Sequence, residues 1–166
     1  MRRLERALQT DLALTERQVR QQYGLGIPGC LERGLNILEL ELAPTTSSTR
    51  KRPLRIVTLE PIERFDFEWR HLVAVAEMRH RLGASPEDWQ GLNHAAQTAP
   101  DAVWQRGLEA WAIEFDAGSY SRTVVAQKIL RFRAAYDHQV WATASEARAK
   151  TLAPWLETGP FVVAPF

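Results

Sequence analysis

The chain has 166 residues, of which 45% are hydrophobic and 25% are charged, a balance typical of folded globular proteins. Its formal net charge of +1 excludes a strong overall attraction to nucleic acid or membrane, so any such attraction must come from how the charges are distributed. The single cysteine, Cys30, excludes an intramolecular disulfide and a multi-cysteine metal site, and it suits a reducing compartment. The first residues lack the continuous apolar stretch of a signal peptide or membrane span. We therefore expect a cytoplasmic protein with no membrane partner.

The first 62 residues combine helical spacing of leucines with strand-like alternation. A capping pattern from Thr15 to Gln18 predicts that a second helix starts there. Residues 24–29 are rich in glycine and are expected to form a turn. The expected elements are helices over residues 1–14, 15–24 and 30–35, and strands over residues 38–42 and 54–59.

The segment between those two strands is polar, is bounded by prolines and ends in a run of basic residues. It predicts a long flexible hairpin tip. Three helices followed by a hairpin with a basic tip are the layout of a winged helix-turn-helix, so residues 1–62 are predicted to be a winged-helix-like DNA-binding module. The alternative is an α+β extension that only packs on the larger domain. The residues expected to contact duplex phosphates are Arg17, Arg20, Arg33, Arg50, Lys51, Arg52 and Arg55.

Residues 69–166 predict a second, larger domain in which helices and strands alternate. The expected helices cover residues 69–82, 121–136 and 145–156, and the expected strands cover residues 102–105, 110–115, 140–143 and 160–163. Residues 89–92 fit either a short strand or another turn of helix. This order predicts an α/β (α+β) fold with a mixed sheet flanked by helices.

Three acidic residues fall on the predicted hairpin of this domain. Asp101 precedes its first strand, whereas Glu114 and Asp116 share one face of its second strand because strand side chains alternate with period two. We therefore expect the three carboxylates to converge. Since Mg²⁺ prefers oxygen ligands, they predict a magnesium site able to activate water for phosphoryl chemistry. The alternative is a solvated strand end.

Lys128 lies in the helix that follows the acidic hairpin. If this lysine returns toward the hairpin, it could stabilise an attacking or leaving oxygen. The candidate catalytic residues are then Asp101, Glu114, Asp116 and Lys128. The alternative for Lys128 is the solvated outer face of its helix, where most lysines lie.

The acidic residues in this order of elements resemble the restriction-endonuclease-like fold with its PD-(D/E)xK motif. Four segments resemble the replication-relaxation family of plasmid and mobile-element proteins more narrowly. They are WRHLVAVAEMR from Trp69, PDAV from Pro100, IEFDAGSY from Ile113 and WATASEAR from Trp141, with Lys128 and Tyr136 between the last two. The resemblance covers roughly residues 69–155 and implies a winged helix ahead of it.

The resemblance to the wider fold implies that Asp101 and Glu114 bind Mg²⁺ and that a lysine two residues after the glutamate assists the nucleophile. Asp116 stands at that position here, so Lys128 would have to supply the charge from its helix. Glu77 matches a position that contributes another carboxylate in some members, although an exposed helix acid is the favoured interpretation. His71 matches a histidine usual in the family, and a structural role is favoured for it over a site role.

The first functional hypothesis is a protein that binds double-stranded DNA in plasmid or mobile-element replication or relaxation. The alternative is a Mg²⁺-dependent DNA endonuclease of the PD-(D/E)xK type. A second alternative is a catalytically inactive interaction module with protein partners in a replication or transposition complex. The sequence leaves the oligomeric state open.

Overall fold

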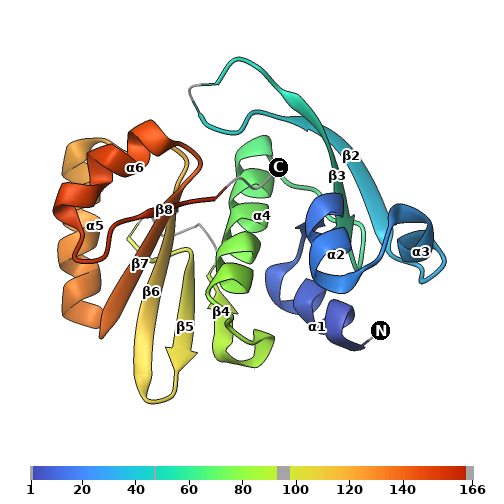
Figure 1. Ribbon diagram of the computed structural model, residues 1–166, viewed down its shortest axis with the longest axis horizontal. Coiled ribbons are helices and arrows are strands. Elements are labelled where there is room, and N and C mark those ends of the chain that lie inside the picture. Colours follow the sequence, from blue (N-terminus) through green and yellow to red (C-terminus); the bar gives the residue numbers. More distant parts are fainter. Residues whose placement is uncertain (1, 47, 93–97, 164–166) are drawn as a thin grey trace.

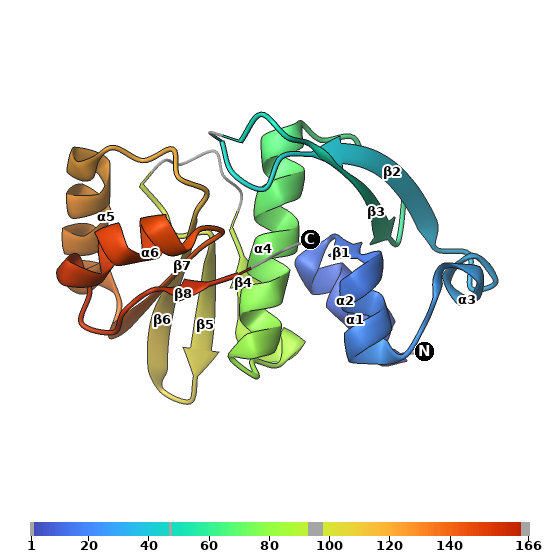
Figure 2. The same cartoon turned by 45° about the horizontal axis from the view of Figure 1, so that its top comes forward.

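The computed structural model describes residues 2–46, 48–92 and 98–163 (Figure 1). The chain forms a layered α+β molecule. Two helices, α5 (Arg122–Ala135) and α6 (Glu146–Leu152), cover one face of a five-stranded sheet, and the long helix α4 (Asp66–Arg81) covers the other. The N-terminal helices and a three-stranded sheet lie beyond α4 (Figures 1 and 2). No helix among the described residues is both long and apolar enough to cross a bilayer.

The N-terminal part alternates short helices and strands. Its elements are α1 (Arg2–Asp11), β1 (Leu14–Thr15), α2 (Glu16–Tyr23), α3 (Ile27–Leu31), β2 (Asn36–Leu42) and β3 (Arg52–Thr58). The three strands are antiparallel and ordered β1-β3-β2. The expected cap of α2 is present, because the Gln18 amide N–H donates to Thr15 Oγ1 at 3.1 Å and the Thr15 N–H donates to Gln18 Oε1 at 2.7 Å.

The prediction for α3 was wrong in its position. This helix covers Ile27–Leu31, whereas the sequence pattern placed it at residues 30–35. Pro28 lies in its first turn, where proline's fixed φ suits a helix and its missing N–H costs nothing. Gly34 then adopts a φ of 72° and turns the chain into β2.

The tip between β2 and β3 is docked on the larger part of the molecule, contrary to the expected flexible hairpin (Figure 2). The Thr46 amide N–H donates to the carbonyl oxygen of Ala117 at 3.2 Å, and the Arg70 side chain donates to that of Ala43 at 2.9 Å. Lys51 Nζ lies 3.2 Å from a carboxylate oxygen of Asp66. The hairpin is therefore fixed at both the end of the five-stranded sheet and the start of α4.

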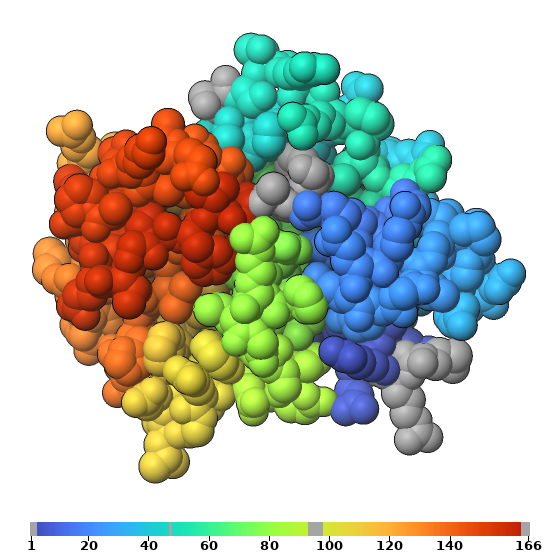
Figure 3. Space-filling view, in the orientation of Figure 1, coloured from blue at the N-terminus to red at the C-terminus, as the bar shows by residue number. Residues whose placement is uncertain are grey.

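Helix α4 is shared by the two parts of the chain, as the space-filling view of Figure 3 also shows. Val75 and Met78 pack into the core of the five-stranded sheet, whereas Val73 and Ala76 pack into the N-terminal cores. The helix begins at Asp66, earlier than the expected residue 69, because the Glu68 carboxylate accepts a 2.9 Å hydrogen bond from the N–H before the first turn.

Buried polar contacts join α4 to the first two helices. The Arg79 guanidinium donates two hydrogen bonds to the Asp11 carboxylate, at 2.8 and 2.5 Å, and both side chains are buried. Gln18 Nε2 donates to the Val73 carbonyl oxygen at 2.8 Å. A bidentate ion pair fixes geometry as well as distance, so these contacts define how the N-terminal part sits on α4.

The five-stranded sheet is mixed, as predicted. Its elements are β4 (Trp89–Gly91), β5 (Ala102–Arg106), β6 (Glu109–Asp116), β7 (His138–Thr143) and β8 (Phe161–Val162), in the order β4-β5-β6-β7-β8. The pairs β4–β5 and β5–β6 are antiparallel, and the pairs β6–β7 and β7–β8 are parallel. Residues 89–91 are thus a strand, preceded by a single 3-10 turn over Pro86–Asp88.

The alternation along β6 sorts its side chains between the two helical layers. Ile113 and Phe115 pack against α4, whereas Ala112 packs against α5. Glu114 and Asp116 share the face of Ala112, as period two requires. Both acids therefore point toward α5 and α6, where they are fully buried.

Tryptophans of the five-stranded sheet lie in or beside its cores. Trp104 and Trp141 are buried, and Trp111 is partly buried against the same core as Trp104. The last helix ends at Leu152, earlier than the expected residue 156, and a 3-10 turn over Ala153–Trp155 follows it. Pro154 explains the change, because proline cannot donate the hydrogen bond that would continue an α-helix.

Candidate functional site

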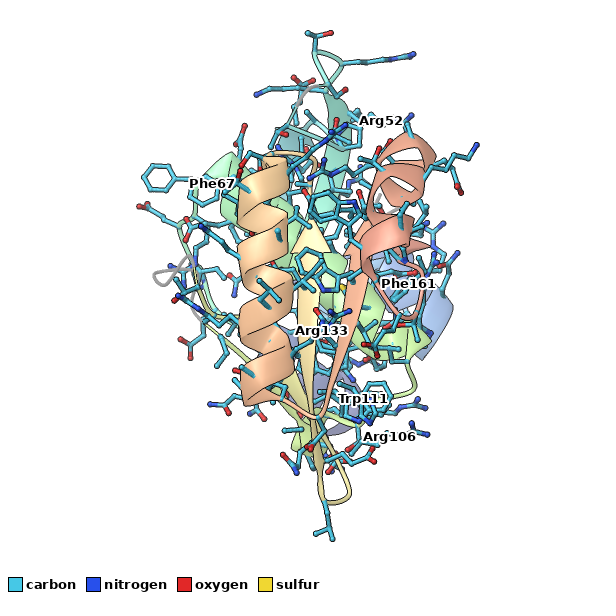
Figure 4. All side chains as sticks on the ribbon, turned by 90° about the vertical axis from the view of Figure 1, so that its left-hand side faces the viewer. Arg52, Phe67, Arg106, Trp111, Arg133 and Phe161 are labelled. Atoms are coloured by element: carbon cyan, nitrogen blue, oxygen red, sulfur yellow. The ribbon has the colours of Figure 1, made fainter. Side chains whose placement is uncertain are left out.

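A pocket of about 410 Å³ opens between the first turn of α4, the segment before β5 and the side of α5. Its lining includes two buried charged residues, Asp101 and Lys128. It also includes three residues with exposed side chains, Phe67, Gln127 and Arg131. Figure 4 shows Phe67 beside the upper end of α5. The pocket thus contains two of the four residues predicted to be catalytic.

Lys128 reaches the acidic hairpin. Its Nζ lies 2.6 Å from Glu114 Oε1, and the exposed fractions of the two side chains are 6% and 0%. The ammonium group also donates to the Ala99 carbonyl oxygen at 3.2 Å and lies 5.0 Å from the centre of the Tyr120 ring. The alternative of a solvated lysine was therefore wrong, because the face of α5 that carries Lys128 is the face packed on the sheet.

The pKa of Glu114 is raised well above its ordinary value. Burial is the largest cause, the nearby Asp101 carboxylate adds to it, and Lys128 opposes both. The pKa of the Tyr120 hydroxyl is also raised, first by burial and then by the negative charge of Glu114. Desolvation therefore outweighs the attraction between Lys128 and Glu114.

Asp101 is held by the pairing of β5 with β6. The Phe115 amide N–H donates to Asp101 Oδ2 at 2.6 Å, and the Asp101 amide N–H donates to the Ile113 carbonyl oxygen at 2.9 Å. The side chain is buried and sits close enough to raise the pKa of Glu114. Asp101 and Glu114 therefore lie near each other, and they are two of the three carboxylates that were expected to converge.

Asp116 is turned to a different partner. Nε and Nη2 of Arg148, in α6, donate to its Oδ2 at 2.8 and 2.6 Å, and the Gly118 N–H donates to its Oδ1 at 2.7 Å. Arg148 Nη2 also donates to the Tyr120 carbonyl oxygen at 2.7 Å. Arg148 therefore holds the loop between β6 and α5. The sequence analysis gave this arginine no role, although it ends the WATASEAR segment.

The arrangement does not fit Mg²⁺. No group of three or more histidine, cysteine or acidic side chains lies close enough to hold a metal ion within residues 2–46, 48–92 and 98–163. Lys128 takes the place of a cation at Glu114, and Arg148 does so at Asp116. Both acids would have to exchange these partners before they could coordinate a metal, so the magnesium site stays a prediction.

A sequence model of the replication-relaxation family matches residues 32–148. The chain belongs to the replication-relaxation family. The match includes the β2–β3 hairpin as well as the five-stranded sheet, so it begins well before the resemblance at residue 69, and it ends at Arg148. Membership indicates a role in the replication or relaxation of plasmids or mobile elements. No significant match was found among curated proteins or solved structures.

Within this family member, the histidine and glutamate of the WRHLVAVAEMR segment are separated. His71 lines the pocket, donates from Nδ1 to the Phe67 carbonyl oxygen at 2.9 Å and packs edge-on against the Phe115 ring. Glu77 lies on the opposite side of α4, where it is buried and bonded to Gln18 and Arg81. It is therefore neither a pocket residue nor the exposed acid that the sequence favoured.

The basic residues expected to contact DNA differ in how they are held. Arg20 and Arg55 are both within ion-pair distance of Glu16, and Arg55 also pairs with Glu39 at 2.9 Å. Arg33 Nη1 donates to a backbone carbonyl oxygen within its own turn at 2.7 Å. Arg17 is partly buried in α2, Lys51 pairs with Asp66, and Arg50 and Arg52 have exposed side chains at the base of the hairpin tip.

Proposed function

We propose that this protein binds double-stranded DNA during plasmid or mobile-element replication or relaxation, with the β2–β3 hairpin holding the duplex beside the pocket. The observation that carries the proposal is the position of the hairpin. Its tip bonds to Ala117, one residue after Asp116, and Lys51 bonds to Asp66, one residue before the pocket residue Phe67. The basic run is therefore joined, through Lys51 and Asp66, to the residue next to the pocket residue Phe67.

The distribution of charge supports the proposal. Residues 1–62 carry ten lysines and arginines against seven acids, whereas the remaining residues carry eleven against thirteen. Positive charge that is concentrated on one part of a nearly neutral protein attracts the phosphate backbone to that part. Figure 4 shows that Arg52 and Phe67 lie toward the same end of the molecule.

The order of elements in residues 1–62 also supports a winged-helix-like module. Three helices precede a two-stranded hairpin, and β1 adds the third strand by pairing with β3. Helix α3, at the place of a recognition helix, has only 5 residues and the apolar sequence IPGCL. Such a helix offers few hydrogen-bonding groups to base edges, so we expect phosphate contacts to dominate and sequence discrimination to be weak.

The test is the salt dependence of duplex binding, measured by fluorescence anisotropy over a series of salt concentrations. Each phosphate contact contributes about 0.9 to the slope of log affinity against log salt. We expect the double variant Arg50→Ala with Arg52→Ala to lower that slope by about 2. The matched control is Arg55→Gln, because two acids already hold that guanidinium. An unchanged slope in the double variant would remove the hairpin from the proposal, and a wild-type protein that does not bind duplex DNA would overturn it.

A metal-dependent DNA endonuclease is the second candidate function. The observation behind it is that Lys128 reaches Glu114 beside Asp101, and it requires Glu114 to exchange Lys128 for a metal ion when DNA is bound. The test is incubation of supercoiled, linear and single-stranded DNA with the protein and Mg²⁺ or Mn²⁺, with Asp101→Ala as the control. Intact DNA in all three forms, or equal cleavage by Asp101→Ala, would exclude this candidate.

A further inference from the structure

We propose that the pocket between α4 and α5 accepts an unpaired nucleotide of the bound DNA, whose base stacks on Phe67. This inference rests on the proposed DNA binding, and it adds what the pocket recognises. It assigns the phosphates to the basic hairpin outside the pocket and the base to the pocket itself.

The first observation is a pair of exposed aromatic rings, one of which lines the pocket. Phe65 and Phe67 are 73% and 51% exposed, and their rings lie 5.9 Å apart with planes only 6° from parallel. Phe67 also lines the pocket. Large apolar side chains that stay exposed side by side mark an interaction site, and flat rings of this kind are the groups on which unpaired bases stack.

The second observation is the lining of the pocket. His71 and Tyr120 add two more rings to that of Phe67, and the His71 ring is held in place by its hydrogen bond to the Phe67 carbonyl oxygen. The exposed amide of Gln127 offers both a donor and an acceptor to a base edge. A volume of about 410 Å³ suits one small, flat ligand and excludes a double helix.

The third observation is the balance of charge in the pocket. Lys128 is paired with Glu114, and the remaining charged lining residues are the carboxylate of Asp101 and the guanidinium of Arg131. The formal charges of these four side chains therefore balance. A free phosphate would have to approach two buried carboxylates, whereas an uncharged base would not. This balance favours the base, and not the phosphate, as the group that enters.

The hairpin and the pocket are joined in a way that suits one continuous strand of DNA. Lys51 is bonded to Asp66, which lies between the two stacked phenylalanines in the sequence. A strand whose phosphates lie along Arg50 and Arg52 would pass this point. An unpaired nucleotide there could place its base on Phe67, whereas a paired base would first have to be unstacked and extruded from the duplex.

The test compares a fully paired duplex with the same duplex carrying one unpaired 2-aminopurine, by anisotropy and by 2-aminopurine fluorescence. Stacking on an aromatic side chain strengthens binding of an unpaired base by about 5- to 150-fold. We expect a preference of that order for the unpaired form, with quenching of its fluorescence. Phe67→Leu should lose most of the preference, Phe67→Tyr should keep it, and paired-duplex affinity should stay within about twofold in both. The matched control is Leu108→Ala, a fully exposed apolar residue at the β5–β6 turn.

The outcomes separate this inference from the proposed function. Equal binding of paired and unpaired DNA by the wild type, or an unchanged preference in Phe67→Leu, would overturn the inference and leave duplex binding intact. If Phe67→Leu weakened the binding of paired and unpaired DNA to the same degree, the inference would also be overturned. Phe67 would then contact the DNA backbone or support the folded structure, and it would not hold a base. Binding of neither form by the wild type would overturn the proposed function as well.

Discussion

Replacing Lys128 with methionine removes the charge from the buried ion pair and keeps most of the length and apolar contact of the side chain. Glu114 would then be a buried carboxylate without its cation, beside Asp101. Removing one partner of a buried ion pair costs about 3–5 kcal/mol of unfolding free energy. For a chain of this size that corresponds to a fall in Tm of about 6–20 °C.

The cost should depend on pH. The pKa of Glu114 in the folded protein already lies above its unfolded value, so between the two values the folded state binds more protons than the unfolded state. Stability therefore rises as pH falls through that window. Lys128→Met raises the pKa of Glu114 in the folded protein further and so widens this pH range. Relative to the wild type, the variant should therefore lose more stability at about pH 8 than at about pH 5.

Urea unfolding followed by circular dichroism at several pH values measures these differences. Replacing both partners, with Lys128→Met and Glu114→Met, should restore stability to within about 1 kcal/mol of the wild type, because burial outweighs attraction in this pair. Gln127→Met is the matched control at a neighbouring exposed position and should change stability by less than about 0.5 kcal/mol. A cost below about 1 kcal/mol for Lys128→Met at every pH would show that Lys128 does not stabilise a buried Glu114 carboxylate.

Three further substitutions test the contacts that hold the fold around the site. Arg148→Ala leaves Asp116 buried without its cation and should cost about 3–5 kcal/mol in urea unfolding, whereas a cost near zero would mean that the bidentate contact is not formed. Asp11→Asn removes the charge that faces Arg79 and should lower the free energy of unfolding by about 1–3 kcal/mol. Amide hydrogen exchange in α1 should become faster, and unchanged exchange would contradict the contact between Asp11 and Arg79. Thr15→Ala removes the cap of α2 and should lower the free energy of unfolding by about 1 kcal/mol, which thermal unfolding can detect, and an equal Tm would show that the cap contributes nothing.

Much of the acidic hairpin could be predicted because strand geometry is local. Period two placed Glu114 and Asp116 on one face of β6, and the structure confirms it. Their separate partners could not be predicted in the same way. Lys128 comes from α5 and Arg148 from α6, and only the packing of both helices on one face of the sheet decides which cation meets which acid.

Helix α4 and the hairpin tip differ in how far their packing could be predicted from the sequence. Trp69, Val73, Ala76 and Met78 are buried on different sides of α4, and this spread of apolar positions is typical of a helix buried on more than one side. The sequence of the hairpin tip has no comparable pattern that would indicate its docking. Thr46 and Ala117 are 71 residues apart, and one of their two hydrogen bonds joins only backbone groups, while the other uses the Thr46 hydroxyl.

The central claim is that the basic hairpin and the pocket form one edge that faces DNA. Site-specific photocrosslinking tests it most directly, with benzoylphenylalanine placed in turn at the exposed positions Thr49, in the hairpin, Gln127, at the pocket, and Leu108, at the β5–β6 turn. We expect the probes at Thr49 and Gln127 to crosslink to neighbouring nucleotides of one bound duplex, and we expect no crosslink from the probe at Leu108. Crosslinking from Leu108 with none from Thr49 would contradict it.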